Sequence, residues 1–297
     1  MTSSTTIALL GTGLLGRAVA ERLHAVGHTV IAYNRTPTKA LPLQTQGIAV
    51  VGAAELAVSQ ADCALLLLTD AAAIRATLLT PACSKALKGK TVVQMGTIGT
   101  NESLEIQREV ELRKGAYCEA PVLGSLAEAK AGTLSVMMGG TEEQFATWLP
   151  LFRSLSREPR YIGPVGKASA LKLALNHLIA AETLAFALSL GVIQRSGVSV
   201  ETFMAILRES ALYAPTFDKK LPRLIKHDYH HPNFSTRHLL KDVLLFFQEA
   251  TARGLTVEAL EGLPRILDRA IARGWGELDY SALFEVVNPP EPGSPLS

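Results

Sequence analysis

One short glycine-rich segment constrains the fold of this chain more than any other feature. Gly11, Gly13 and Gly16 follow an apolar, strand-like run at residues 6–10 and open an amphipathic stretch that extends to residue 25. A strand, a glycine turn and a helix in this order predict the start of a βαβ unit that binds a dinucleotide. Gly11 permits the tight turn, Gly13 lets a pyrophosphate approach the backbone, and Gly16 lets the helix pack against the sheet. The free N–H groups at the helix start favour phosphate binding.

The rest of the first half repeats this alternation of strand and helix. Near-continuous apolar runs, typical of parallel strands buried on both faces, are expected as strands at residues 29–33, 63–68 and 91–95. Helical patterns lie between and after them at residues 38–46, 53–60, 71–79 and 102–114. Further strands are expected at residues 116–119, 134–138 and 160–162. This order predicts a doubly wound, mostly parallel α/β sheet of the Rossmann type.

The second half has almost no strand signal. Residues 166–196 are expected to form one long helix, which joins the sheet domain to an all-α domain. The remaining helices are expected at residues 199–209, 216–226, 235–252, 257–273 and 279–287. The sequence therefore predicts a nucleotide-binding domain at 1–163, an all-helical domain at 164–288 and a flexible Pro-rich tail at 289–297.

Composition excludes several classes of protein. The chain has 297 residues, is 48% hydrophobic and 19% charged, and carries a net charge of +2, so we expect a globular protein that does not bind nucleic acid. Three widely spaced cysteines and the absence of a signal peptide favour reduced thiols and a cytoplasmic location. Residues 173–193 are apolar enough to suggest a membrane span, but Asn176, His177 and Glu182 favour a buried core helix and no membrane partner.

The end of the second strand discriminates between nicotinamide cofactors. An NAD enzyme usually places an acidic residue there for the ribose 2′-hydroxyl, whereas this chain has Asn34, Arg35 and Thr36. Arg35 can pair with a 2′-phosphate, Asn34 and Thr36 can add donors, and Lys39 lies one turn further on. The sequence therefore predicts NADP(H) over NAD(H). The alternative is that Arg35 is a solvated surface arginine.

Lys172 stands out in the long helix. It lies at the start of a nearly all-apolar stretch, where a lysine is costly to desolvate unless it is paired or used in chemistry. Asn176 follows four residues later and falls on the same helix face. We expect Lys172 to act as an acid/base beside the nicotinamide, the alternative being a structural lysine that reaches out to solvent.

Three histidines gather in one short segment. His227, His230 and His231 lie in what we expect to be a loop between two helices. Such a cluster could bind a metal ion. We favour the interpretation that these histidines are solvated or structural, and we expect no metal.

Five motifs in order give the chain a family resemblance. They are the glycine turn at residues 11–16, the Asn34-Arg35-Thr36 turn, the loop Glu119-Ala-Pro-Val-Leu-Gly-Ser125 followed by Ala131-Gly-Thr-Leu134, the series Gly166, Lys172 and Asn176, and the series Phe234, Lys241 and Asp242. In this order they resemble the β-hydroxyacid dehydrogenases, which include 3-hydroxyisobutyrate dehydrogenases and glyoxylate/succinic semialdehyde reductases. The resemblance covers nearly the whole chain.

The resemblance implies a role for each matching position. Lys172 would be the catalytic acid/base and Asn176 would orient it or the substrate. Phe234 and Asp242 would line the substrate pocket, and Lys241 would reach toward the cofactor. The other residues expected to bind the cofactor are Gly11, Thr12, Gly13, Leu14, Leu15, Gly16, Asn34, Arg35, Thr36, Lys39, Leu67, Leu68, Thr69 and Thr97.

One loop departs from the family pattern. The family loop usually has Asp-Ala-Pro-Val-Ser-Gly-Gly, and its serine and first glycine hold the substrate carboxylate. This chain has Leu123, Gly124 and Ser125 at the last three positions, and Leu123 cannot donate a hydrogen bond. We expect Gly124 to offer its backbone N–H and Ser125 to stand in for the missing hydroxyl.

These features favour an NADP-dependent reductase (EC 1.1.1.-) of a small aldehyde acid such as glyoxylate or succinic semialdehyde, acting as a homodimer or homotetramer. One alternative is an imine reductase-like enzyme, because imine reductases share this architecture. They usually carry Asp or Tyr where Lys172 stands, but Leu123 would suit an apolar pocket. The other alternative is a non-catalytic NADP-binding scaffold, whose mark would be loss of the lysine.

Overall fold

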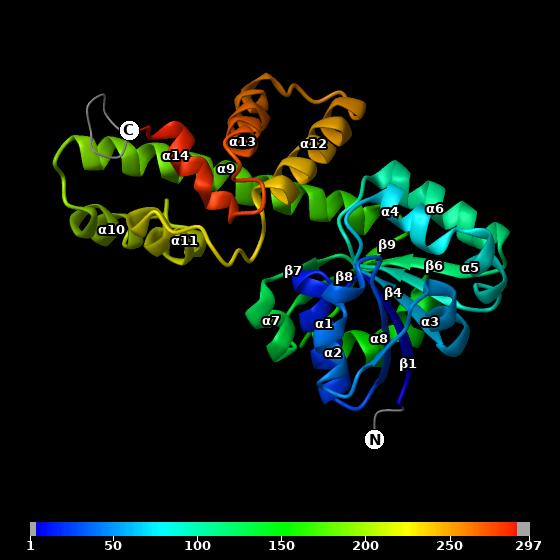
Figure 1. Ribbon diagram of the computed structural model, residues 1–297. Helices are drawn as coiled ribbons and strands as arrows, with labels where there is room; N and C mark the ends of the chain where they lie inside the picture. Colours follow the sequence, from blue (N-terminus) through cyan, green and yellow to red (C-terminus); the bar gives the residue numbers. More distant parts are fainter. Residues whose placement is uncertain (1–3, 290–297) are drawn as a thin grey trace. The chain divides into compact units, whose positions relative to one another are not determined.

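The computed structural model describes residues 4–289, so all but one residue of the predicted tail lies outside the described part. The chain forms two compact units that divide between Lys172 and Leu173. The division therefore falls inside the long helix and not before it, where the sequence placed the domain boundary. Unit 1 contains the predicted, mostly parallel sheet with helices around it (Figure 1).

Unit 1 is built on one twisted sheet. Among the described residues its strands are β1 (Thr6–Leu10), β2 (Thr29–Tyr33), β3 (Ala49–Val50), β4 (Cys63–Leu66), β5 (Thr91–Gln94), β6 (Ala116–Glu119), β7 (Val122–Leu123), β8 (Ser135–Gly139) and β9 (Arg160–Gly163). Their order is β3-β2-β1-β4-β5-β6-β8-β7, with β9 paired to β8. Strands β1 to β6 are parallel, whereas β8 runs antiparallel to β6 and β7. The order 3-2-1-4-5-6 is that of a Rossmann fold, with its switch point between β1 and β4.

Helices cover both faces of this sheet. One face carries α1 (Leu14–Ala25), α2 (Leu41–Gln44), α7 (Leu126–Ala131) and α8 (Glu142–Leu155). The other face carries α3 (Ala54–Gln60), α4 (Ala71–Leu78), α5 (Pro81–Ala86) and α6 (Thr100–Leu112). A single 3-10 turn, Pro37–Lys39, precedes α2.

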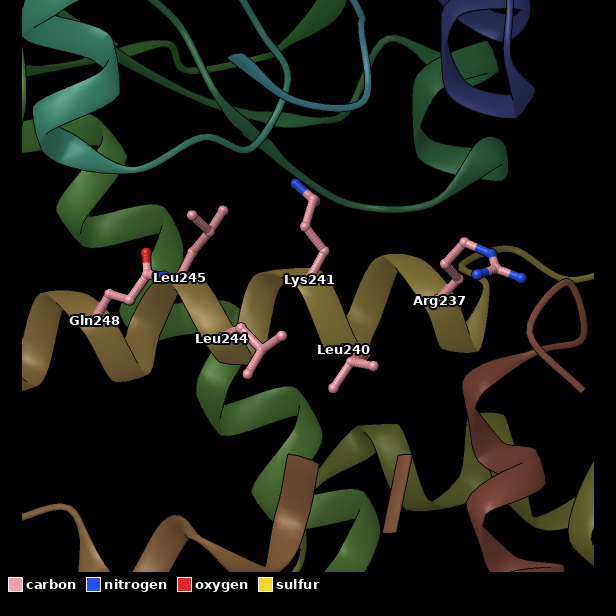
Figure 2. A pocket seen from close by; sticks show the side chains of 6 residues that line it. All are labelled: Arg237, Leu240, Lys241, Leu244, Leu245 and Gln248. Atoms are coloured by element: carbon pink, nitrogen blue, oxygen red, sulfur yellow. The ribbon is translucent and has the colours of Figure 1, made fainter. Parts of the chain in front are cut away.

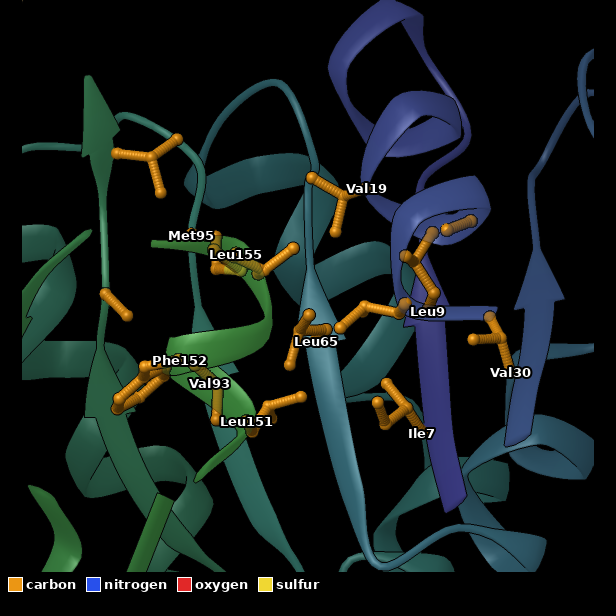
Figure 3. Packing of buried hydrophobic residues seen from close by; sticks show 14 of the residues in the cluster. Ile7, Leu9, Val19, Val30, Leu65, Val93, Met95, Leu151, Phe152 and Leu155 are labelled. Carbon is orange, nitrogen blue, oxygen red and sulfur yellow. The ribbon is translucent and has the colours of Figure 1, made fainter. Parts of the chain in front are cut away.

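The apolar run of β1 explains why both faces must be covered. Ile7 and Leu9 point into the layer with α1 and α8, and Ala8 and Leu10 point into the layer with α3. Figure 3 shows the first layer, where Val19 and Phe152 close over the strands. Successive strand residues face opposite sides, so a continuous apolar run needs a hydrophobic layer on each side.

Unit 2 is all-helical in the described residues. The long helix α9 (Lys167–Arg195) leads into α10 (Val200–Arg208), α11 (Pro215–Lys226), α12 (Thr236–Ala252), α13 (Gly262–Ala272) and α14 (Leu283–Val287). Their shared core includes the stacked rings of Phe186 and Phe217, whose centroids lie 4.6 Å apart. One buried ion pair, Lys220 Nζ to Asp279 Oδ1 at 2.7 Å, joins α11 to the turn before α14.

Three predicted helices were wrong in extent. The pattern at residues 279–287 is a 3-10 turn, Tyr280–Ala282, followed by α14. The pattern at residues 257–273 is a 3-10 turn, Glu258–Leu260, followed by α13, because Pro264 fits only the first turn of a helix. The pattern at 38–46 likewise contains Pro42 and resolves into a 3-10 turn and the short α2. The short elements β3, β7, α5 and α7 were not predicted, because they are too short to show a periodicity.

Helix α9 is the one helix in the described residues that is long and apolar enough to cross a membrane by length and composition. Its buried positions include Asn176 and Thr183, which are 3% and 2% exposed and pack inside the protein. The polar groups and the packing favour the predicted core helix.

All three cysteines are free and buried. Burial raises the pKa of Cys63 to about 12, and it also raises the pKa values of Cys83 and Cys118. The thiols are therefore protonated and shielded at neutral pH, which is typical of structural cysteines.

Candidate functional site

The glycine turn after β1 has no room for side chains. A Cβ on Gly11 would lie 2.4 Å from the carbonyl oxygen of Leu67, and Gly11 also has a φ of +103°. A Cβ on Gly16 would lie 2.0 Å from the carbonyl oxygen of Gly11. At Gly13, by contrast, there is open space, and this residue caps α1. The turn is therefore packed tightly against Leu67, the first residue after β4. It is open at Gly13, where a pyrophosphate would approach.

The start of α1 suits an anion. Leu14 and Leu15 begin the helix, and its first turn contains no acidic residue, so the unpaired backbone N–H groups and the helix dipole are not opposed. Thr12 is buried and its hydroxyl accepts a hydrogen bond from Asn34 Nδ2 at 2.9 Å. These residues fit a dinucleotide, and they include the predicted positions 11–16.

Asn34 has a structural role at the end of β2. Its amide nitrogen is engaged by Thr12, and its Oδ1 accepts from the backbone N–H of Thr36 at 2.9 Å. The side chain therefore ties the ends of β1 and β2 together. Its expected role as a direct donor to the cofactor stays a prediction.

Arg35 borders a surface pocket of about 230 Å³ at the end of β2. Apolar walls come from Ala40, Leu41 and Val50, which suit a flat heterocycle. Thr36 and Lys39 are exposed and lie outside the lining of the pocket. An arginine at the rim of such a pocket can pair with a phosphate on the ribose.

The loops after β4 and β5 meet at the same edge of the sheet. Gln94 is buried, and its side chain donates to the carbonyl oxygen of Gly96 at 2.9 Å and accepts from the N–H of Gly96 at 2.8 Å. This closed pair fixes the turn that carries Thr97. A Cβ on Gly96 would lie 2.6 Å from the carbonyl oxygen of Leu68, so the turn also packs against the segment that contains the predicted Leu67, Leu68 and Thr69.

The start of α9 is held by a buried carboxylate. Glu119 is fully buried at the end of β6, and its Oε1 accepts from the N–H groups of Gly166, Ala168 and Ser169 at 2.8, 2.9 and 3.0 Å. Its Oε2 accepts from the hydroxyls of Ser169, at 2.6 Å, and of Ser103, at 2.5 Å. Lys172, which is half-buried, follows Ser169 by three residues on the same helix. The carboxylate thus caps the helix turn from which Lys172 extends.

In unit 2, Asn176, Lys241 and Asp242 form a polar cluster. Asp242 is 2% exposed, and its Oδ2 accepts from Asn176 Nδ2 at 2.5 Å. Lys241 Nζ lies 2.8 Å from Asp242 Oδ1, an ionic contact that lacks hydrogen-bond geometry. Asn176 and Asp242 are buried together, and the hydrogen bond between them offsets part of the cost of burying their polar groups. Their expected roles in the site stay predictions.

Lys241 also lines a pocket of about 320 Å³ along α12. Figure 2 shows its lining side chains, which all come from this helix: Arg237, Leu240, Lys241, Leu244, Leu245 and Gln248. Nearby, burial and the charge of Lys241 lower the pKa of His238, so this imidazole is neutral at pH 7. This face of α12 therefore combines an apolar surface with two cations, Arg237 and Lys241.

Phe234 lies just before α12 and is half-buried at the edge of the helical core. Its ring packs edge-on to Tyr280, with centroids 5.9 Å apart. The expected contact of Phe234 with substrate stays a prediction.

The histidine cluster has a structural role at one position. His227 Nδ1 lies 2.7 Å from Glu285 Oε1, and it ends α11 in the left-handed region with a φ of +49°. Within residues 4–289 no group of three potential metal ligands comes together.

Three residues at this edge were not predicted from the sequence. Glu119 was noted only as part of a motif, Gln94 was not singled out, and Glu128 was missed. The spacing of Ser125 and Glu128, Ser-x-x-Glu, is that of a capping box and could have indicated the start of α7. No sequence signal identified Gln94, since its role depends on a turn of the backbone.

The sheet order, the glycine turn at its switch point and the helical second unit define a Rossmann-type dinucleotide-binding protein. A family model described as the NAD binding domain of 6-phosphogluconate dehydrogenase matches residues 6–163. A second model, described as NAD-binding of NADP-dependent 3-hydroxyisobutyrate dehydrogenase, matches residues 166–287. The chain belongs to the β-hydroxyacid dehydrogenase family, as the motifs predicted.

Relatives from Arabidopsis thaliana match over nearly the full length. One, named glyoxylate/succinic semialdehyde reductase 1, is 27% identical over 95% of this chain and 98% of its own length. Another, named probable 3-hydroxyisobutyrate dehydrogenase-like 1, mitochondrial, is 30% identical over 95% of this chain and 85% of its own. These names support an NAD(P)-dependent dehydrogenase of the hydroxyacid type.

Solved structures confirm the fold. A 3-hydroxyisobutyrate dehydrogenase from Mycobacterium tuberculosis, with L-serine, has a TM-score of 0.82 at 24% identity and covers 96% of this chain and 99% of its own. An imine reductase from Myxococcus stipitatus, in complex with NADP+, has a TM-score of 0.66 at 17% identity, with coverage of 95% and 99%.

Proposed function

We propose that the protein is an NADPH-dependent reductase of small aldehydes, with Lys172 as the proton donor. The proposal is carried by Lys172, which is half-buried on α9 at the family's lysine position, one turn after the helix start that Glu119 caps. NADPH, when bound, supplies the hydride. The rim arginine of the β2 pocket, Arg35, supports the phosphorylated cofactor.

The chain's own residues would transfer the proton and orient the reacting groups. Lys172 as an ammonium donates a proton to the carbonyl oxygen as negative charge develops there, so the product is an alcohol. Asn176, whose amide is oriented by Asp242, aligns the lysine or the substrate on the next turn of α9. In the reverse direction neutral Lys172 accepts the hydroxyl proton.

The names of the relatives make glyoxylate and succinic semialdehyde the first aldehydes to assay. A cyclic imine belongs in the same screen, because Leu123 gives the loop after β6 an apolar residue that suits a C=N substrate. Oxidation of NADPH by the imine alone would replace the aldehyde proposal with an imine reductase. Binding of NADPH without turnover of any compound would favour a scaffold.

The Lys172→Ala variant tests the proton donor. We expect kcat to fall roughly 100- to 10,000-fold, the usual contribution of a general acid, while NADPH affinity stays within about twofold. Lys167→Ala is the matched control, since Lys167 is an exposed lysine at the start of the same helix. Near-normal turnover of Lys172→Ala would refute the assignment.

A further inference from the structure

The loop between β6 and α7 lies at the ligand-binding edge of the sheet. Glu119 ends β6 opposite Gln94, and Ala120 N–H donates to the carbonyl oxygen of Gln94 at 2.7 Å, so the loop runs beside the turn that carries Thr97. Ligands of doubly wound sheets bind outside the carboxyl ends of the strands. The loop root is also tied to the start of Lys172's helix through Glu119. The root of the loop at residues 120–125 therefore lies beside both the turn of Thr97 and the start of the helix that carries Lys172.

This loop has an apolar side chain at its centre. Leu123 is half-buried and is held in register by antiparallel pairing with Ser135, next to the pair of Val122 and Val136. Gly124, with a φ of +137°, follows it, and a Cβ there would lie 2.7 Å from Leu134. The backbone is therefore fixed, and the position that a serine would need for a carboxylate holds a side chain with no donor.

Both donors of Ser125 already hold a carboxylate from the chain itself. The backbone N–H of Ser125 donates to Glu128 Oε2 at 2.8 Å, and the hydroxyl of Ser125 donates to the same oxygen. Ser125 is the N-cap of α7 and Glu128 is its third residue, so this arrangement is the glutamate half of a capping box. Ser125 was predicted to stand in for the family serine, but its hydroxyl has this other partner.

A substrate carboxylate would have to compete for these donors. It would meet Leu123 on one side and, at Ser125, two donors that are bound to an anion. The substrate carboxylate and Glu128 would compete for the donors of Ser125. This competition does not depend on the other interactions of Glu128. An uncharged substrate has no such requirement and gains from contact with Leu123.

We infer that the loop at 120–125 selects against substrates that carry a carboxylate, and that the preferred aldehydes are uncharged. The inference rests on the proposed aldehyde reduction at Lys172. Within a family of hydroxyacid enzymes, Leu123 and the pair of Ser125 and Glu128 would thus be the specificity-determining residues of this chain.

Matched substrates test the selectivity. Succinic semialdehyde and its amide, 4-oxobutanamide, have nearly the same size and differ in the charged group. We expect kcat/KM of the wild-type protein to favour the amide by roughly 10-fold or more, the effect of one or two charge-assisted hydrogen bonds that cannot form. A preference for succinic semialdehyde would overturn the inference, while turnover of either compound would still support the proposed function.

Variants test the mechanism of selection. Glu128→Ala combined with Leu123→Ser frees the donors and adds a hydroxyl, and we expect the ratio of acid to amide to rise roughly 10- to 100-fold. Glu128→Gln keeps an acceptor for Ser125, so its ratio should stay within about threefold of wild type. An equal change of the ratio in Glu128→Gln and in the double variant would contradict the occupation of the donors. Gln144→Ala, which removes the capping-box partner of Thr141 in α8, is the control for loss of a cap alone and should leave the ratio unchanged.

Binding gives a readout that does not need turnover. Calorimetry on the protein loaded with NADP+ compares 4-hydroxybutyrate with 4-hydroxybutanamide. Tighter binding of the amide supports the inference, and tighter binding of the acid refutes it. If neither aldehyde oxidises NADPH, the proposed function fails while the binding ratio still decides the selectivity of the loop.

Discussion

At the residue scale, this chain uses polar side chains mainly to fix other groups in place. Asn34 ties the ends of β1 and β2, Gln94 closes a turn on itself, and Asp242 orients Asn176. Each of these side chains makes its hydrogen bonds within its own unit. Lys172 and Arg35, which are expected to contact ligands directly, are therefore surrounded by groups that are already fixed in place. This preorganisation lowers the entropy cost of binding.

Arg35 gives the clearest prediction at this scale. We expect Arg35→Ala to weaken NADPH binding roughly 10- to 100-fold, because hydrogen bonds to a charged phosphate contribute about 1.5–3 kcal/mol. NADH binding should change by less than about twofold, since that cofactor has no 2′-phosphate. Fluorescence titration of both cofactors measures the ratio. Arg108→Ala, an exposed arginine on α6, is the control, and an unchanged NADPH/NADH ratio in Arg35→Ala would disprove the assignment.

At the element scale, the helix that carries Lys172 depends on one buried carboxylate. The three N–H groups that bind Glu119 Oε1 belong to the first turn of α9 or directly precede it, and a helix cannot satisfy such groups itself. Two hydroxyls complete the shell around Oε2. Truncation of Glu119 would therefore leave several buried donors without an acceptor.

Substitution of Glu119 should destabilise unit 1 in a graded way. We expect Glu119→Ala to lower the free energy of unfolding by roughly 3 kcal/mol or more. Glu119→Gln should cost about 1 kcal/mol, because its carbonyl can still accept from the N–H groups while the two serine hydroxyls turn to accept from its amide. Urea titration followed by Trp148 in a Trp275→Phe background reports on unit 1 alone. Equal unfolding midpoints for Glu119→Ala and the exposed control Glu158→Ala would contradict this role.

The strands and long helices of this chain could be predicted because their signals are local. The strands at 6–10, 29–33 and 116–119 have the predicted bounds, since apolar runs between glycine turns leave few alternatives. The capping box of Thr141 and Gln144 at the start of α8 is a local signal of the same kind. The short α5, α7 and β7 could not be found by periodicity. A helix of fewer than two turns and a strand of fewer than three residues are too short to show a repeating pattern.

The candidate site was only partly open to prediction. The glycine turn and the rim position of Arg35 follow from motifs that are contiguous in the sequence. The Glu119 cap joins residues that are far apart in sequence, and the engagement of Ser125 by Glu128 requires the backbone of the loop. These hydrogen-bond partners are brought together by the tertiary structure, and the secondary-structure propensity of single residues does not reveal them.

At the scale of the whole molecule, the two units have separate cores and different surfaces. Large exposed apolar side chains lie on the helices of unit 2, and they include Leu178, Leu188, Val192 and Ile206. Where such side chains form a contiguous surface, that surface is typical of a contact site between proteins. We propose that the protein is a homodimer or homotetramer in which this surface is covered by another copy.

Light scattering after size exclusion tests the assembly. We expect a mass that is two or four times the chain mass of 31.7 kDa. Leu188→Lys combined with Val192→Lys places two charges on one face of α9 and should shift the mass toward 31.7 kDa. Leu112→Lys, at an 82% exposed leucine of unit 1, should leave it unchanged. A monomeric wild-type protein would rule out the proposal.

The three cysteines have a practical consequence. Cys63 and Cys118 lie in strands of the sheet, and Cys83 lies on the buried side of α5, so none of these thiols can meet a reagent while unit 1 is folded. The rate at which a maleimide modifies the wild-type chain therefore equals the rate of opening of that unit when trapping is fast. The modification rate of the native cysteines thus reports the opening rate of the nucleotide-binding unit. The helical unit has no cysteine and therefore does not contribute to this rate.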